Sequence, residues 1–129
     1  MAIFHADYSI ESNRGAMLSV DFKFRRKSDG TPMTFGVGDI VRFKIMEKNK
    51  CENVVLQKDV KITELCEYVN VTIPSEEMKI GGIINKPVDY WYELELNPDT
   101  PSSTTLIGYT KKTGGRVFTL TPEGGDKKW

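Results

Sequence analysis

Glu93 and Glu95 are the acidic pair in this sequence whose spacing comes closest to that of a catalytic site. They stand two residues apart in the stretch DYWYELEL (89–96), and same-face neighbours on a β-strand lie about 7 Å apart. Two carboxyl groups at roughly that separation can hydrolyse a glycosidic bond, provided that burial raises the pKa of one of them. The alternation of this stretch predicts that both face water, so we expect no hydrolase here.

The other residue types that carry catalysis are sparse. A Ser–His–Asp or Cys–His arrangement needs a histidine as its base, and His5, close to the start of the chain, is the sole histidine. Cys51 and Cys66 lie fifteen residues apart without a CxxC motif, and a zinc site needs three or four ligands. The glycines of FGVGD (35–39) lack the lysine and the following helix of a phosphate-binding loop. We therefore expect a protein that is not an enzyme and has no cofactor and no metal site.

Trp91 is the residue whose type contradicts its position. Every second residue of DYWYELEL is apolar, which predicts a strand with one buried and one exposed face. The predicted exposed face contains Asp89, Trp91, Glu93 and Glu95. Trp91 therefore stands among carboxylates on the side that should meet water.

Three interpretations of Trp91 remain open. A cross-strand aromatic residue or a folded-back terminus would cover it, with Phe4 and the final residue, Trp129, as candidates. Alternatively, Trp91 anchors a protein–protein contact, where tryptophan and tyrosine are enriched. In the third interpretation Trp91 stacks on a sugar ring together with Tyr109 or Tyr68, and nearby carboxylates accept the hydroxyl hydrogen bonds. The candidate interface residues are Trp91, Tyr109, Trp129 and Phe4.

The composition excludes several classes of partner. Of 129 residues, 39% are hydrophobic and 28% charged, which is enough for a modest core. Lysine plus arginine and aspartate plus glutamate number 18 each, so no basic excess favours nucleic acid, and the basic cluster at 23–27 is expected to be solvated surface. MAIFHADYSI lacks the pattern of a secretory signal, and no run approaches the ~18 apolar residues of a membrane span. We expect a protein made in a cytoplasm that binds neither nucleic acid nor membrane.

Several segments of the sequence alternate as strands do. The clearest are 18–24, 41–45, 69–73 and 89–96, and the shorter ones are NVVLQ near residue 55, VKI (60–62), TTLIGY (104–109) and RVFTL (116–120). Turn residues separate them, and only SEEMKI (75–80) has the start of a helix. The pattern predicts an all-β fold: an immunoglobulin-like β-sandwich of about seven to nine short antiparallel strands with at most one short helix. We expect a single domain over residues 1–129, with its core at about 17–122 and a flexible C-terminal tail at 123–129.

The order of these features resembles a known family. MLSVDFKF is followed by VGDIVRFKIME, NVVLQKDVKI, VNVTIPSEEM, DYWYELEL and a final TTLIGY…GGRVFTLTPEGG. This pattern is similar to the small β-sandwich modules of tailed phages and prophages of Gram-positive bacteria, above all the N-terminal domain of baseplate upper proteins, and to head-fibre and decoration modules. The resemblance implies a non-enzymatic virion component that attaches to other virion proteins of the capsid, neck or baseplate, as a homo-oligomer or in many symmetric copies.

We accordingly expect a structural protein of a phage or prophage virion. It would serve as an accessory baseplate or tail component, or as a head fibre or decoration protein. The alternative is a carbohydrate-binding module that recognises a host cell-wall glycan, because aromatic residues beside carboxylates on a β-sandwich are typical of such modules.

Overall fold

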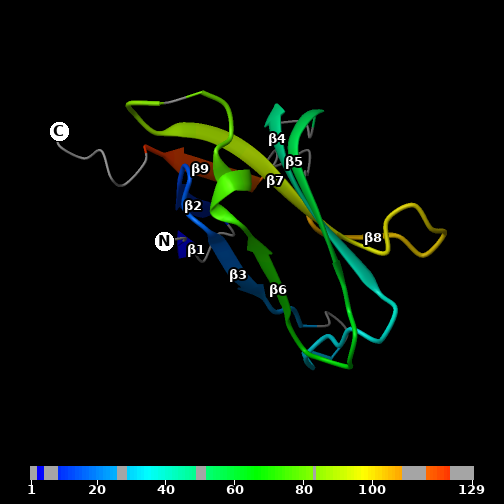
Figure 1. Ribbon diagram of the computed structural model, residues 1–129. Coiled ribbons are helices and arrows are strands. Elements are labelled where there is room, and N and C mark those ends of the chain that lie inside the picture. Colours follow the sequence, from blue (N-terminus) through cyan, green and yellow to red (C-terminus); the bar gives the residue numbers. More distant parts are fainter. Residues whose placement is uncertain are drawn as a thin grey trace.

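Two β-sheets of unequal size pack face to face in the computed structural model of this chain (Figure 1). The structure describes residues 3–4, 9–25, 29–48, 52–82, 84–108 and 116–122. The described elements are β1 (Ile3–Phe4), β2 (Ile10–Asn13), β3 (Leu18–Phe22), β4 (Ile40–Lys48), β5 (Glu52–Lys61), β6 (Val69–Ile73), the 3₁₀ helix η1 (Ser75–Met78), β7 (Val88–Leu96), β8 (Thr104–Ile107) and β9 (Arg116–Thr121).

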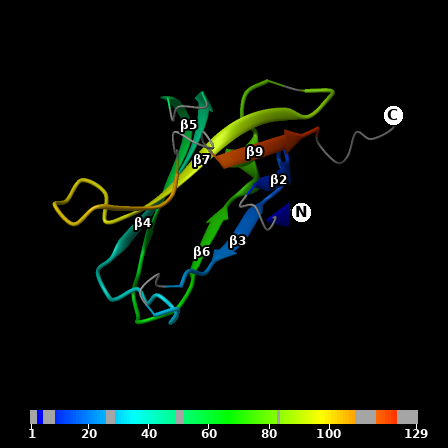
Figure 2. The same cartoon turned by 180° about the vertical axis from the view of Figure 1, so that it is seen from behind.

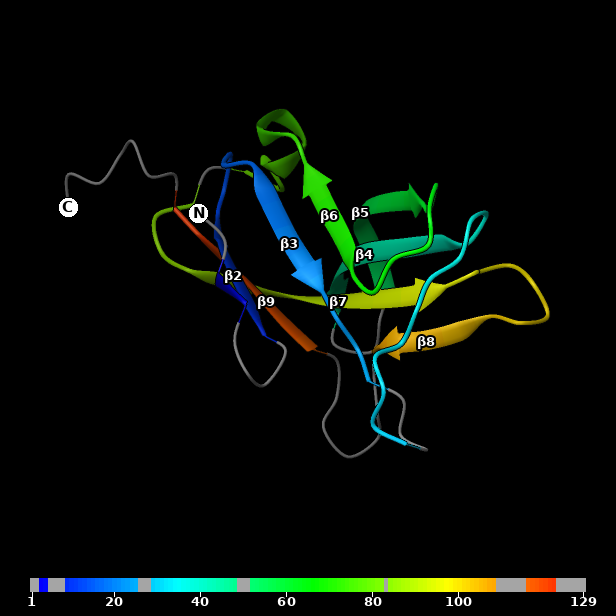
Figure 3. The same ribbon diagram turned by 90° about the horizontal axis from the view of Figure 1, so that it is seen from below.

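The strands divide between a seven-stranded and a two-stranded sheet. The larger sheet has the order β1–β2–β9–β7–β4–β5, with β8 also paired to β7, and the smaller sheet consists of β3 and β6. Figures 1 and 3 show β3 and β6 together as a separate layer, and Figure 2 shows β7 and β9 side by side from behind. The larger sheet therefore has one face toward the small sheet and one face away from it.

Alternation along the strands builds the core between the two sheets. The small sheet buries every second residue, namely Leu18, Val20, Phe22, Val69, Val71 and Ile73. Opposite them, β4 and β7 bury Val41, Phe43, Ile45, Tyr92 and Leu94. The rings of Phe22, Phe43 and Tyr92 connect the sheets, with centroids 5.7–6.4 Å apart. Aromatic pairs at such distances stabilise a core beyond the area they bury, so this cluster is the centre of the sandwich.

The expected all-β sandwich with at most one short helix is confirmed. Its seven and two strands divide less evenly than the four and three of an immunoglobulin constant domain. One pairing also differs from the expected antiparallel arrangement, because β2 lies parallel to β9, from Ile10 opposite Phe118 to Asn13 opposite Thr121. Parallel strands need a long connection. Most of the chain lies between these two strands, so no hairpin forces them to be antiparallel.

β5 is longer than the sequence predicts. The segments NVVLQ and VKI predict two short strands. In the structure they form one strand of 10 residues that ends at Lys61. Among the described strands β5 pairs only with β4, at the edge of the sheet, where the polar residues between the two segments can face water. The register shifts between Ile45 and Met46, which leaves Val55 as the extra residue of a bulge.

The N-terminal strands extend the sheet ahead of residue 17, where the core was expected to begin. Just after β2, Arg14 is buried and donates from Nε to the carbonyl of Ile80 at 3.1 Å and from Nη2 to that of Gly81 at 2.9 Å. A buried guanidinium requires such acceptors, so Arg14 fixes the segment after η1. Gly81 has φ of 66°, a conformation that favours glycine. The expected tail at 123–129 lies outside the described residues.

Candidate binding surfaces

Trp91 lies on the face of the larger sheet that points away from the small sheet. Its strand neighbours Tyr90 and Tyr92 pack on the core, and Tyr92 is fully buried. Across the strands, Trp91 stands opposite Met46 on β4 and Val117 on β9. The indole is partly buried. Its described cross-strand neighbours are therefore apolar but not aromatic, and such pairs stabilise a sheet.

An apolar row crosses this outer face through Trp91. In register it consists of Val54 on β5, Met46, Trp91 and Val117, and we call it the outer apolar row. Met46 is fully buried, whereas Val54 is 48% exposed and its neighbour Val55 39% exposed. The row is therefore shielded from solvent at Met46 and exposed to solvent at the β5 edge of the sheet.

Glu93 and Glu95 point to the same side as Trp91 and share one cation. Lys44 Nζ lies 3.1 Å from Oε1 of each, and the side chains of Glu93 and Glu95 are only 16% and 20% exposed. They point outward as the alternation predicts, but both contact Lys44. Gly108 also lies close to Glu93, since a Cβ at Gly108 would be 3.3 Å from Glu93 Oε2. Two carboxylates that share a cation do not provide the isolated buried acid that glycoside hydrolysis requires.

The two carboxylates also change the acidity of Lys44. Burial by itself lowers the pKa of this lysine, because it disfavours the charged form. The hydrogen bonds to Glu95 and Glu93, together with the attraction of their charges, outweigh that effect and raise the pKa of Lys44 above its ordinary value. Lys44 is therefore charged throughout the neutral pH range.

Arg42 forms a second ion-pair group further along β4. Its Nε and Nη2 donate to Oδ1 and Oδ2 of Asp59 at 2.9 and 3.1 Å, and its Nη1 donates to Oδ2 of Asp99 at 3.1 Å. The hydrogen bond to Asp59 is the main reason that the pKa of Arg42 is raised further. Together with Lys44, Arg42 is a cation of the outer face that already contacts two carboxylates.

The outer face of the small sheet carries a ladder of polar side chains. Asn70 Nδ2 donates to Ser19 Oγ at 3.1 Å and to Asp21 Oδ1 at 2.8 Å, and Thr72 Oγ1 donates to Asn70 Oδ1. Tyr68 directly precedes β6, two residues before Asn70, and is 48% exposed. Continued by one residue, the alternation of β6 places Tyr68 on this face at the end of the ladder. We call these five residues the polar ladder. The sequence contained its signal, since both strands alternate with polar residues, but only the pairing of β3 with β6 joins them.

The structure places the predicted interface residues in different regions. Trp91 lies on the outer face of the larger sheet and Tyr68 on that of the small sheet, so these two residues do not form a common sugar platform. Phe4 belongs to β1, and its side chain is not described. Tyr109 and Trp129 lie outside the described residues.

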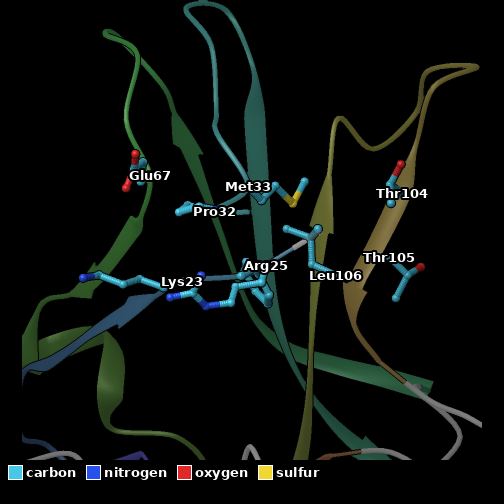
Figure 4. A pocket seen from close by; sticks show the side chains of 9 residues that line it. Lys23, Arg25, Pro32, Met33, Glu67, Thr104, Thr105 and Leu106 are labelled. Carbon is cyan, nitrogen blue, oxygen red and sulfur yellow. The ribbon is translucent and has the colours of Figure 1, made fainter. Parts of the chain in front are cut away.

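A groove lies between the end of β3 and β8 (Figure 4). It has a volume of about 790 Å³ and is lined by Lys23, Phe24, Arg25, Pro32, Met33, Glu67, Thr104, Thr105 and Leu106. One wall consists of Phe24 and Arg25 next to Pro32 and Met33: Arg25 and Pro32 form an antiparallel bridge, and Met33 N donates to the carbonyl of Phe24 at 2.9 Å. The sequence predicted solvated surface for the basic cluster at 23–27, and its members Lys23 and Arg25 are exposed but line this groove. The groove itself could not be predicted, because its other wall comes from a segment far away in the sequence.

Two further classes of site, a membrane-spanning helix and a metal centre, are absent from the described part of the chain. None of its helices is long and apolar enough to cross a membrane, and no three of its His, Cys, Asp and Glu side chains are grouped as a metal ion would require. Comparisons with protein-family profiles, with curated proteins and with solved structures find no significant match to this chain.

Proposed function

We propose that this chain is a non-enzymatic structural protein of a bacteriophage or prophage virion. It attaches to other virion proteins as an accessory baseplate or tail component, or as a head fibre or decoration protein. The order of its strand and turn motifs supports this proposal, together with the sandwich architecture that the resembled modules have. Proteins of this kind work through contacts that bury apolar side chains at the centre and keep polar groups at the rim.

The outer apolar row is the observation that carries the proposal. Its open end at Val54 and Val55 leaves apolar area exposed at a sheet edge. The neighbouring cations Lys44 and Arg42 already contact carboxylates, so a protein that docks here covers these two cations with their partners in place. The net charge of zero also keeps repulsion between copies low.

The test compares exposed valines inside and outside the row. Val54→Glu places a charge at the open end of the row, and Val37→Glu places one at a turn where the valine is 74% exposed. Light scattering over a wide concentration range, alone and with co-encoded virion proteins, should show a discrete assembly for the wild type and Val37→Glu that Val54→Glu loses. A wild-type protein that stays monomeric and binds none of those proteins contradicts the proposal, and an unaffected Val54→Glu variant removes the row from it.

The polar ladder favours glycan binding as the second candidate function. Tyr68 offers an exposed ring beside amide, hydroxyl and carboxylate groups that can hydrogen-bond to sugar hydroxyls. Affinity electrophoresis through gels that contain cell-wall polysaccharide tests this function. Tyr68→Ala should abolish retardation, whereas Tyr68→Phe keeps the ring and should keep most of it. A wild-type protein that no wall fraction retards excludes this candidate.

A further inference from the structure

We propose that the groove between the end of β3 and β8 binds an extended, acidic segment of a partner protein. The proposal rests on an apolar floor, on two cations that have no carboxylate partner among the described residues, and on a strand edge with which no described strand pairs. The groove shares no residue with the outer apolar row. This inference therefore does not depend on the particle in which the chain works.

The floor of the groove is apolar and held in place. Phe24, Met33 and Leu106 are partly buried and pack against the hydrophobic core. Figure 4 shows Leu106 pointing from β8 toward Met33 and Arg25 across the groove. The backbone hydrogen bond from Met33 N to the carbonyl of Phe24 holds the two segments of this wall together. Apolar side chains of a ligand would thus meet a preorganised surface, which lowers the entropic cost of binding.

The charges of the groove differ from those of the outer sheet face. Lys23 and Arg25 are exposed, and within the described chain neither forms an ion pair with a carboxylate. Arg25 Nη1 donates to the carbonyl of Gly30 at 2.9 Å, which positions the guanidinium and leaves its other donors for a ligand. Glu67 is the sole carboxylate of the lining, so two cations and one anion give the lining a net charge of +1. A carboxylate on the partner complements this charge.

β8 offers the partner a backbone with which to pair. Its register partners all belong to β7, so in the described chain no strand pairs with its second edge. An open edge accepts an extended peptide through main-chain hydrogen bonds, while alternate side chains of the peptide determine the specificity. A segment that alternates apolar and acidic residues would place the former on the floor and the latter near Lys23 and Arg25. Among possible occupants, such a segment uses all three features of the groove.

The test measures binding of a fluorescein-labelled peptide that alternates valine and glutamate, by fluorescence anisotropy. Lys23→Glu/Arg25→Glu should bind it at least about ten-fold more weakly, because two attractions become repulsions. The matched variant Lys61→Glu/Lys79→Glu makes the same change of net charge at exposed lysines outside the groove and should lose less than about two-fold.

Two single variants sharpen the test. Lys23→Glu removes no hydrogen bond of the described structure, so it should leave the fold intact and weaken binding about three-fold. Glu67→Gln removes the carboxylate of the lining and should tighten binding about two-fold. Circular dichroism checks that each variant is folded. A gain of affinity in Glu67→Gln cannot come from unfolding.

Four results would overturn the proposal. The first is that a peptide with lysine in place of glutamate binds as tightly as the acidic peptide, and the second is that Lys61→Glu/Lys79→Glu loses as much affinity as Lys23→Glu/Arg25→Glu. The third is that polyphosphate competes as well as the acidic peptide at equal charge. The fourth is that the anisotropy does not change at any peptide concentration. The polyphosphate result would assign the two cations to a non-specific anion surface. Val54→Glu should bind the peptide as the wild type does, so a failure of the groove and a failure of the outer apolar row are distinguishable.

Discussion

Replacing Lys44 with methionine should destabilise the sandwich, because Glu93 and Glu95 would then face each other without a cation. Both carboxylates lie 3.1 Å from Lys44 Nζ, and the three side chains are 16–23% exposed. An exposed ion pair contributes about 0.2–1 kcal/mol, whereas removing one partner of a buried pair costs about 3–5 kcal/mol. These side chains are mostly but not fully covered, so we expect a loss of about 2 kcal/mol in the free energy of unfolding.

Urea denaturation followed by tryptophan fluorescence measures this loss. The triple variant Lys44→Met/Glu93→Gln/Glu95→Gln should recover most of it, because neutral groups then replace the whole ion-pair group. A loss below about 0.5 kcal/mol in Lys44→Met would refute the view that the group is shielded from water. A triple variant as unstable as the single one would show that lost packing, and not bare carboxylates, causes the effect.

The difference in unfolding free energy between the wild type and Lys44→Met should also depend on pH, and the raised pKa of Lys44 determines the direction. The pKa of Lys44 is raised in the folded protein, so the folded state holds this proton more tightly than the unfolded state, where lysine titrates near about 10.4. The stability from this lysine is therefore complete below that pH and is lost as the pH rises through the higher folded-state pKa. The stability difference between the wild type and Lys44→Met should be constant from about pH 7 to 9 and shrink above about pH 10.5.

Three further predictions test the core, the cover of the ion-pair group and the two surfaces. Phe43→Ala should cost about 3–5 kcal/mol in urea denaturation, because its ring is fully buried between two other aromatic rings, whereas Val37→Ala, at a position 74% exposed, should cost less than about 0.5 kcal/mol. Gly108→Ala should cost about 1–2 kcal/mol, since a Cβ there would lie 2.7 Å from Thr105 Cγ2, and Thr105→Ala in the same chain should restore part of it. Raising the salt from about 0.05 to 0.5 M should weaken peptide binding in the groove, measured by anisotropy, but leave assembly through the outer apolar row, measured by light scattering, nearly unchanged.

Alternation was sufficient to locate the strands that have one face in the core. The segments Leu18–Phe22 and Val69–Ile73 each alternate between buried and exposed residues, as the sequence predicts. The same rule divided β5 in two, because an edge strand need not keep one face apolar. The parallel pairing of β2 with β9 could not be predicted, because strand direction between distant segments depends on the whole chain path.

The candidate site was predictable only where it depends on a single strand. The alternation of β7 correctly places Trp91 on the side away from Tyr92 and the core. Its neighbours Met46 and Val117 come from other strands, and the bulge at Val55 sets which residues of β5 continue the row. Register between strands is a property of the fold. The sequence alone therefore predicted that Glu93 and Glu95 face water, whereas in the structure both pair with Lys44 from the neighbouring strand and are mostly covered.

The two proposed surfaces, the outer apolar row and the groove, would select partners by different physical means. The cations beside the row already contact carboxylates, so binding there depends on short-range apolar burial and on shape. The cations of the groove have no carboxylate partner in the described chain, so they attract an acidic segment over a longer range and reject a basic one. Because the two surfaces share no residue, one copy of the chain would hold an acidic segment of one partner while its sheet face docks on another. Holding two neighbours at once is what a protein that links subunits of a larger assembly must do.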